Sequence, residues 1–325
     1  MGFTYSLSIS IDKQISWSLI KTNIYIKIFF TTFIITTIIS ITQPKANHII
    51  YTFVLSLLLI SVYNTSQHIK MMLDLGTFTI QGGGDYRGYS DYITLLLPFA
   101  LVTLKYPKSI TNNLVYLLIF LSFIITFSTG ARGAYLAIGI TIIFWLIIKK
   151  DWYSFITFIG MTFFTLIIGY ILIDPNTFAH IFQTSTSGRS GSGTWGIAWD
   201  LIKIKPLTGF GYGSEIFVKV FNENLSVHNH WLIKNPIGAH NIFLTMWLYG
   251  GIFLFLSFIL LNLNVVKELI YYSKSKRMEP RDLLSIAILL SFLSEFTVRG
   301  FFEDVQLEIL GIYFGILLSR NYLKN

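Results

Sequence analysis

Cysteine is absent from all 325 residues of the chain, and charged residues are scarce, at 12% of the total. The absence of cysteine excludes disulfide bonds, iron–sulfur clusters, thiolate-bound zinc and a cysteine nucleophile. The scarcity of charge, together with 53% hydrophobic residues and a mean hydropathy of +0.63, excludes a soluble domain of this length. The chain is therefore predicted to be an integral membrane protein.

Other signals are missing as well. The sequence has no internal repeat, no low-complexity tract and no nucleic-acid-binding motif or basic stripe. Residues 2–20 lack the apolar core and small-residue cleavage site of an ordinary signal peptide. The net charge of +8 needs no special partner, because Lys and Arg that anchor membrane helices on the cytoplasmic side account for half of the basic residues.

Long apolar runs fill most of the chain and predict an all-α bundle of about 9–10 transmembrane helices. A β-barrel is disfavoured because these runs are continuously apolar, whereas barrel strands alternate between apolar and polar residues. We expect a single integral membrane domain over residues 1–325. The runs are 24–41, 49–63, 92–104, 114–127, 134–148, 155–173, 242–263, 283–296 and 307–318.

Basic residues between the runs predict the orientation by the positive-inside rule. With the spans above, residues 174–238 form one large periplasmic loop, and 64–91 and 297–305 share its side. An odd number of spans with an inner C-terminus places Met1 outside, whereas Lys13, Lys21 and Lys27 favour the inside, so either the count is off or further helices precede the chain. The cytoplasmic set is Lys105, Lys108, Lys149, Lys150, Lys267, Lys274, Lys276, Arg277, Arg281, Arg320 and Lys324.

The loop 174–238 is polar and carries a glycine-rich segment around Arg189. Trp195, Ala198, Trp199 and Ile202 then recur at helical spacing, which predicts a short amphipathic helix in the membrane interface, capped by Thr194 and closed at Lys205-Pro206. Two interpretations remain: a surface helix with a solvated Arg189, or a lid that holds a phosphate-binding arginine over the membrane.

Arg132 lies in Ser128-Thr129-Gly130-Ala131-Arg132-Gly133-Ala134, between two apolar runs. A guanidinium at a membrane boundary is costly unless it reaches headgroups or faces a polar cavity. It is therefore either an interfacial anchor or, because its small neighbours let helices pack closely, a ligand for an anion.

His240 lies in Ala239-His240-Asn241, where the loop returns to the membrane. Histidine ordinarily titrates near pH 6.5, which suits proton abstraction, although an interfacial hydrogen bonder is the plainer interpretation. His228 and His230 compete for that role, and the three histidines also raise the possibility of zinc. We expect no metal, because no carboxylate or histidine spacing of a known site accompanies them.

As a set, these motifs are specific. Arg132 with its small neighbours, Arg189, Trp195-x-x-x-Trp199, Lys205-Pro206-Leu207-x-Gly209-x-Gly211-x-Gly213, Ala239-His240-Asn241 and Tyr249-Gly250-Gly251 follow in this order. Over residues 128–260 the chain resembles the O-antigen ligase and O-antigen polymerase family of bacterial membrane glycosyltransferases. The resemblance implies an all-helical inner-membrane protein with its active site facing the periplasm, no cofactor, no metal, and an undecaprenyl-diphosphate-linked glycan as donor.

The resemblance also implies roles for particular residues. Arg132 and Arg189 match arginines that engage the diphosphate, and His240 matches the histidine that activates the acceptor hydroxyl; Trp195 and Asn241 join the arginines in substrate binding. The acceptor stays open: lipid A core for a ligase, a second lipid-linked glycan for a polymerase, or protein for a related transferase. A lipid-linked sugar transporter or flippase is the alternative, but it should show repeated halves and charges spread over many spans.

Further loop residues have two possible roles each. The carboxylates Glu215, Glu223, Glu303 and Asp304 could orient a sugar, but solvated loop carboxylates are the plainer interpretation. The aromatic residues Tyr212, Trp231 and Trp247 could stack on sugar rings or form an interfacial belt.

Overall fold

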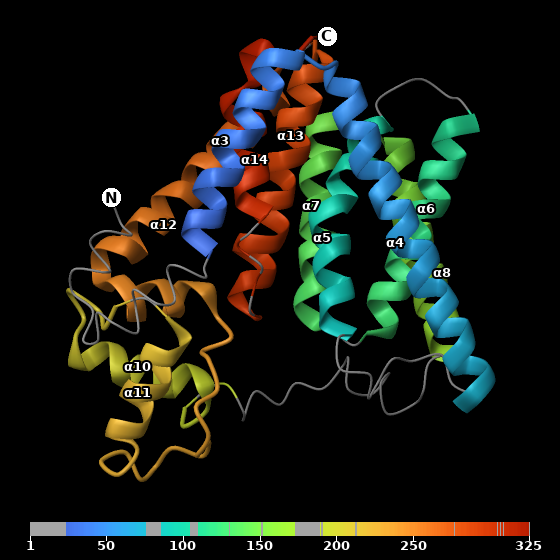
Figure 1. The fold of residues 1–325 in the computed structure, drawn as a ribbon. Helices are drawn as coiled ribbons and strands as arrows, with labels where there is room; N and C mark the ends of the chain where they lie inside the picture. The colour runs from blue at the N-terminus through green and yellow to red at the C-terminus, as the bar shows by residue number, and fades with distance from the viewer. Residues whose placement is uncertain are drawn as a thin grey trace. The chain divides into compact units, whose positions relative to one another are not determined.

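Figure 1 shows the computed structural model of the chain. The structure describes residues 24–75, 86–104, 110–129, 131–150, 152–172, 189, 191–211, 213–275, 277–303, 305, 307 and 309–324. Expectations that concern 81–85, 174–188, Lys105, Lys108, Gly130, Tyr212, Lys276 and Asp304 lie outside these residues.

The all-α, polytopic membrane fold is confirmed, and the described residues of the nine apolar runs lie in helices to within two residues at the ends. Within the described residues, the one β pairing is an isolated bridge between Lys45 and Lys324. In the part of the chain that the structure describes, four helical segments are long and apolar enough to cross a bilayer, namely Ala46–Gln67, Arg132–Lys149, Ile242–Lys274 and Pro280–Phe301. Contacts divide the chain into two compact units, so the single domain over 1–325 stays a prediction.

The second unit holds the described residues of Ile38–Gln183, Val265–Arg299 and Ser319–Asn325. Helix α5 (Tyr86–Thr103) lies at its centre, in contact with α4, α6, α7 and α13, and every residue from Ile93 to Leu104 is buried. The surrounding elements are α4 (Ala46–Leu75), α6 (Ile110–Ser128), α7 (Arg132–Lys149), α8 (Trp152–Leu172), α13 (Pro280–Phe292) and the π-helix η1 (Leu293–Val298).

A buried ion cluster joins α5 to the end of η1. Arg299 is 1% exposed and pairs with Asp91 of α5 and with Glu295. Its Nη1 lies 2.6 Å from Glu295 Oε1, and the Thr94 hydroxyl also donates to the Glu295 carboxylate. The cluster places three charged residues inside the helical core of this unit. Opposite charges bonded to one another are what make such burial tolerable in a membrane protein.

The first unit holds the described residues of Met1–Thr37, Thr184–Asn264 and Gly300–Leu318. Two short helices, α10 (Thr194–Ile204) and α11 (Ser214–Asn224), pack with the segment 225–241 around a small hydrophobic core, and together we call them the loop module. The core residues are Ile197, Leu201, Ile202, Phe210, Ile216, Phe217, Val220, Phe221, Trp231 and Leu248. Helix α10 is confirmed, but most of its apolar face lies in this protein core, with Trp199 remaining 43% exposed.

Helices α3 (Ile24–Thr42) and α14 (Ile309–Leu318) meet at two glycines of α14. Thr32 donates its hydroxyl to the carbonyl of Gly311 over 3.1 Å, and Thr36 donates to that of Gly315 over 3.3 Å. A Cβ on Gly311 would lie 2.8 Å from the Ile28 carbonyl oxygen. This spacing of small residues is the one that lets membrane helices approach closely.

Helix α12 (Ile242–Lys274) is broken at Gly251, whose backbone is non-helical (φ 63°, ψ −163°). The carbonyls freed by the break are satisfied by the glycine-rich segment 205–213: the amides of Phe210 and Gly211 bind the carbonyls of Leu248 and Tyr249 over 2.9 and 3.0 Å. In return the amide of Ile252 binds the Pro206 carbonyl over 3.0 Å. We call residues 206–211 the strap.

Candidate functional site

Arg132 is the first residue of α7 and follows a tight turn from α6. Thr129 donates its hydroxyl to the Thr126 carbonyl over 2.7 Å and accepts the Ala131 amide over 3.3 Å, which fixes the turn. The small neighbours Ala131 and Ala134 are buried, with 4% and 0% exposure, and the role of the arginine stays a prediction. Arg132 itself is half-buried, in the second unit.

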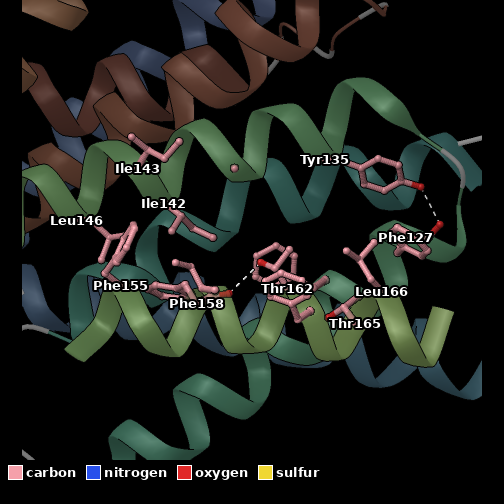
Figure 2. A pocket seen from close by; sticks show the side chains of 14 residues that line it. Phe127, Tyr135, Ile142, Ile143, Leu146, Phe155, Phe158, Thr162, Thr165 and Leu166 are labelled. Atoms are coloured by element: carbon pink, nitrogen blue, oxygen red, sulfur yellow. Dashed lines mark hydrogen bonds between the residues drawn. The ribbon is translucent and has the colours of Figure 1, made fainter. Parts of the chain in front are cut away.

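An apolar pocket of about 550 Å³ lies between α6, α7 and α8, beginning one helical turn from Arg132 at Tyr135. Figure 2 shows Tyr135 donating its hydroxyl to the Phe127 carbonyl, over 2.7 Å. The Thr162 and Thr165 hydroxyls are likewise bonded to backbone carbonyls of their own helix. The pocket therefore offers hydrocarbon and aromatic surface, which suits an alkyl or isoprenoid chain. Its lining is Phe123, Phe127, Tyr135, Gly139, Ile142, Ile143, Leu146, Phe155, Phe158, Ile159, Thr162, Phe163, Thr165 and Leu166.

Arg189 begins a compact turn at the N-terminus of α10, in the first unit. Its carbonyl accepts the Trp195 amide over 2.8 Å, and Gly191 adopts a left-handed φ of 61°. The expected cap is wrong: Gly193 is the N-cap residue, and the side chain of Thr194 makes no capping bond. The Thr194 hydroxyl, on a residue 5% exposed, has no hydrogen-bond partner within the described residues.

Trp195 has a buried indole N–H that likewise finds no acceptor among the residues the structure describes. Its ring packs edge-on against Phe301, with centroids 5.5 Å apart, and Phe301 packs in the same way against Phe243 of α12 at 5.9 Å. Phe301 thus connects the start of α10 to the start of α12. Sequence analysis missed this residue, although the Phe301-Phe302 pair directly precedes the charged Glu303.

His240 and Asn241 form the N-terminus of α12. Asn241 caps the helix, because its Oδ1 accepts the amides of Phe243 and Leu244 over 2.9 and 3.1 Å. His240 is half-buried and has a left-handed φ of 48°, which is costly for a residue with a side chain. Such local strain is commonly found at functional positions. The capping bonds account for Asn241 structurally, through its side-chain oxygen Oδ1.

Two interpretations of loop residues need correction, those of Glu303 and Trp231. Glu303 is only 5% exposed, so it is not a solvated loop carboxylate, while Glu215 and Glu223 are exposed as expected. Trp231 is buried in the loop module core and forms neither a sugar platform nor an interfacial belt. Trp247 stacks on Phe255 and donates its indole N–H to the Pro206 carbonyl over 2.9 Å.

His228 and His230 do have a carboxylate beside them, contrary to the expectation. Asp200 of α10 lies 3.0 Å from His230 Nε2, accepts the Trp231 indole N–H over 3.1 Å and pairs with Lys203 at 3.1 Å. Burial raises the pKa of Asp200, but the hydrogen bonds from Trp231, Lys203 and His230 outweigh it, so the pKa lies below its ordinary value. Asp200 is therefore ionised at neutral pH, and two of its partners, His230 and Trp231, lie 30 and 31 residues away in sequence.

In the first unit, Phe301 packs against both Trp195, at the start of α10, and Phe243, at the start of α12. The expected site residues His240 and Asn241 directly precede this start of α12. Arg189 is joined to the start of α10 by its backbone bond to Trp195. Arg132 belongs to the second unit, beside the apolar pocket. One unit thus offers polar donors and a candidate base, and the other a cation next to a hydrocarbon pocket.

Comparison with known proteins gives a consistent assignment. Residues 117–259 match the family model described as O-antigen ligase. The chain is similar to the O-antigen ligase of Salmonella typhimurium (strain LT2), with 32% identity over 247 residues that cover 72% of this chain and 59% of the relative. The chain thus spans about three fifths of the length of that curated relative. No solved structure matches the chain.

Proposed function

Since the chain belongs to the O-antigen ligase family, we propose that it is a membrane glycosyltransferase that transfers a glycan from an undecaprenyl-diphosphate carrier to lipid A core. The acceptor hydroxyl oxygen attacks the anomeric carbon of the glycan, the bond from that carbon to the phosphate breaks, and the lipid diphosphate leaves. The reaction takes place on the periplasmic side of the inner membrane, and no metal or cofactor takes part in the transfer step.

The observation that carries this proposal is the indole N–H of Trp195. A buried donor without an acceptor costs about 1–3 kcal/mol. The Trp195 N–H has no acceptor in the described part of the chain, so it is suited to bind a ligand oxygen. The Thr194 hydroxyl beside it is in the same situation. Both stand at the N-terminus of α10, where the helix dipole favours an anion, and the Arg189 turn leads into this helix.

The diphosphate and the isoprenoid chain of the donor suit groups of the second unit. Arg132 supplies a guanidinium whose planar fork suits phosphate oxygens, and the pocket that begins at Tyr135 takes part of the isoprenoid chain. A diphosphate is already a good leaving group, so Arg132 and Arg189 contribute by neutralising the charge that develops on it.

His240 takes the proton of the acceptor hydroxyl. Its neighbour Asn241 holds the start of α12 in place through the cap and so fixes the backbone from which the imidazole projects. Asn241 Nδ2 and the indole of Trp195 bind glycan or phosphate oxygens. Burial of Glu303 in the same unit makes it a further candidate for orienting a sugar hydroxyl.

One observation favours the flippase alternative, namely the buried cluster of Arg299, Glu295 and Asp91. Its charges, however, are concentrated at one place and are bonded to one another, whereas a transport path should carry ionisable groups through many spans. The enzyme is therefore preferred.

Gene deletion followed by electrophoresis of surface polysaccharide tests the proposal. A lost ligase leaves naked core with accumulated lipid-linked polymer, whereas a lost polymerase leaves single repeat units on the core, and unchanged polysaccharide would refute both. Complementation with Trp195→Phe keeps the ring against Phe301 but removes the N–H, and should lower transfer about tenfold or more. Trp199→Phe on the same helix is the matched control and should restore wild-type polysaccharide.

A further inference from the structure

Asp200, His228 and His230 form a cluster that the transfer reaction does not use. Each offers one atom of a kind that binds metals, and these three atoms lie within 4.8 Å of one another. Asp200 belongs to α10, while the two histidines belong to the segment that follows α11. The cluster therefore brings together two parts of the loop module that are distant in sequence.

The indole of Trp231, which is 1% exposed, holds two of the three side chains in position. Its N–H is bonded to Asp200 Oδ2, and the ring of His228 stacks on its face with centroids 4.7 Å apart and planes 5° apart. Groups that orient metal ligands in this way are a regular part of metal sites, where a hydrogen bond fixes the direction of each ligand. The third side chain, that of His230, is 58% exposed and free to adjust its rotamer.

We propose that Asp200, His228 and His230 bind Zn²⁺, which ties the segment 228–231 to helix α10. Two imidazole nitrogens and one carboxylate oxygen match the ligand preference of zinc, whereas Ca²⁺ and Mg²⁺ prefer all-oxygen sites. Water completes the tetrahedron at the fourth position.

The geometry requires a small closure. Zinc–ligand distances of about 2.0–2.2 Å place tetrahedral ligand atoms roughly 3.4 Å apart. Ligand atoms farther apart than this, within the 4.8 Å that the cluster spans, must approach one another, while His230 Nε2 and Asp200 Oδ2 must separate slightly. His230 Nε2 is already 3.0 Å from Asp200 Oδ2, and both become ligands of the same ion when the hydrogen bond between them is replaced. Lys203, whose Nζ lies 3.1 Å from Asp200 Oδ1, opposes the cation electrostatically and must move aside.

The bound ion supports the fold of the loop module and is separate from the transfer chemistry. The same segment is already attached to the α10 start by one backbone bond, from the Leu232 amide to the Ser192 carbonyl over 3.1 Å. Zinc adds a further attachment at Asp200, in the middle of α10, where hydrogen bonds from His230 and Trp231 already join the segment to the helix. Anything that binds the folded state and not the unfolded state stabilises the fold, so zinc should raise the melting temperature of the protein.

The test uses the full chain, purified in detergent through a tag without histidine and stripped with EDTA. Titration with Zn²⁺ by calorimetry should show one ion per chain, and Co²⁺ should give the visible absorption bands of a tetrahedral site. His230→Ala, an exposed position where folding is not at stake, and Asp200→Asn should each weaken zinc binding at least about tenfold. Lys203→Gln should bind zinc as tightly as the wild type or more tightly, because it removes the competing charge.

His48→Ala, on α4 in the second unit, is the matched histidine control and should bind zinc like the wild type. Absence of stoichiometric zinc binding would overturn the proposal, as would binding that His230→Ala and Asp200→Asn leave unchanged. Weaker binding by Lys203→Gln would also contradict it, because the lysine would then support the site instead of opposing it.

Discussion

Replacement of Gly251 by alanine should destabilise the loop module severely, because three separate effects act at this one position. A residue with a side chain is strained by about 1–3 kcal/mol at φ 63° and ψ −163°. The added Cβ would also lie 2.1 Å from the Leu207 carbonyl oxygen, and relieving such a backbone overlap costs about 1–3 kcal/mol. Moving the strap away would further weaken the bond from the Ile252 amide to the Pro206 carbonyl.

Together these effects predict a loss of about 2–6 kcal/mol, and hence a fall in melting temperature of at least about 3 °C. Thermal unfolding of the purified chain, followed by tryptophan fluorescence, measures this fall. Gly209→Ala should behave similarly, because its Cβ would lie 2.6 Å from the Gly251 amide nitrogen. Gly238→Ala in the same module meets nothing within 4 Å and should melt like the wild type. Equal melting temperatures for Gly251→Ala and Gly238→Ala would refute the strap as a stabilising contact.

Three other predictions concern the site and its surroundings. Arg189→Ala and Arg132→Ala should each abolish glycan transfer by purified protein while membrane insertion stays normal. Lysine at either position should restore only part of the activity, because it lacks the bidentate fork, and wild-type turnover by an alanine variant would exclude that arginine from diphosphate binding. His240→Gly should relieve the left-handed strain and raise the free energy of unfolding by roughly 1 kcal/mol, while the rate of transfer falls about 100-fold to 10,000-fold. His230→Ala should transfer at the wild-type rate, and an active His240→Gly enzyme would rule out His240 as the general base. Because the pKa of Asp200 is lowered on folding, its stabilising contribution is present above the ordinary aspartate pKa and is lost as pH falls through the lowered value. Wild type and Asp200→Asn should therefore differ in melting temperature at pH 7 and converge in acid, below the lowered pKa; a difference that persists there would contradict this.

Helix positions were predictable because they depend on local composition. The nine apolar runs and α10 are all helical, as continuous apolar stretches and helical spacing indicate. The break at Gly251 was not predicted, although Gly250-Gly251 was noted as a motif, because its cause lies some forty residues upstream in the strap. Apolar composition gives no sign of such a contact.

The same limit applies to side-chain clusters. His228 and His230 were recognised, but Asp200 was not placed beside them, because the contact depends on how α10 and the segment after α11 fold around Trp231. Arg299 with Glu295 and Asp91 was missed although Glu295 interrupts an apolar run, which is a usable signal for a buried charge that needs a partner. Whether Arg132 acts together with Arg189 and His240 stays a prediction.

The broken helix also has a consequence for biosynthesis. The part of α12 that follows Gly251, residues 252–274, is long enough to cross a bilayer without the part before it. A nascent chain can therefore insert that half first. Ile242–Gly250 takes its place when the strap, which is synthesised earlier, binds the Leu248 and Tyr249 carbonyls. Insertion and docking become two successive events, and the candidate base His240 acquires its position only at the second.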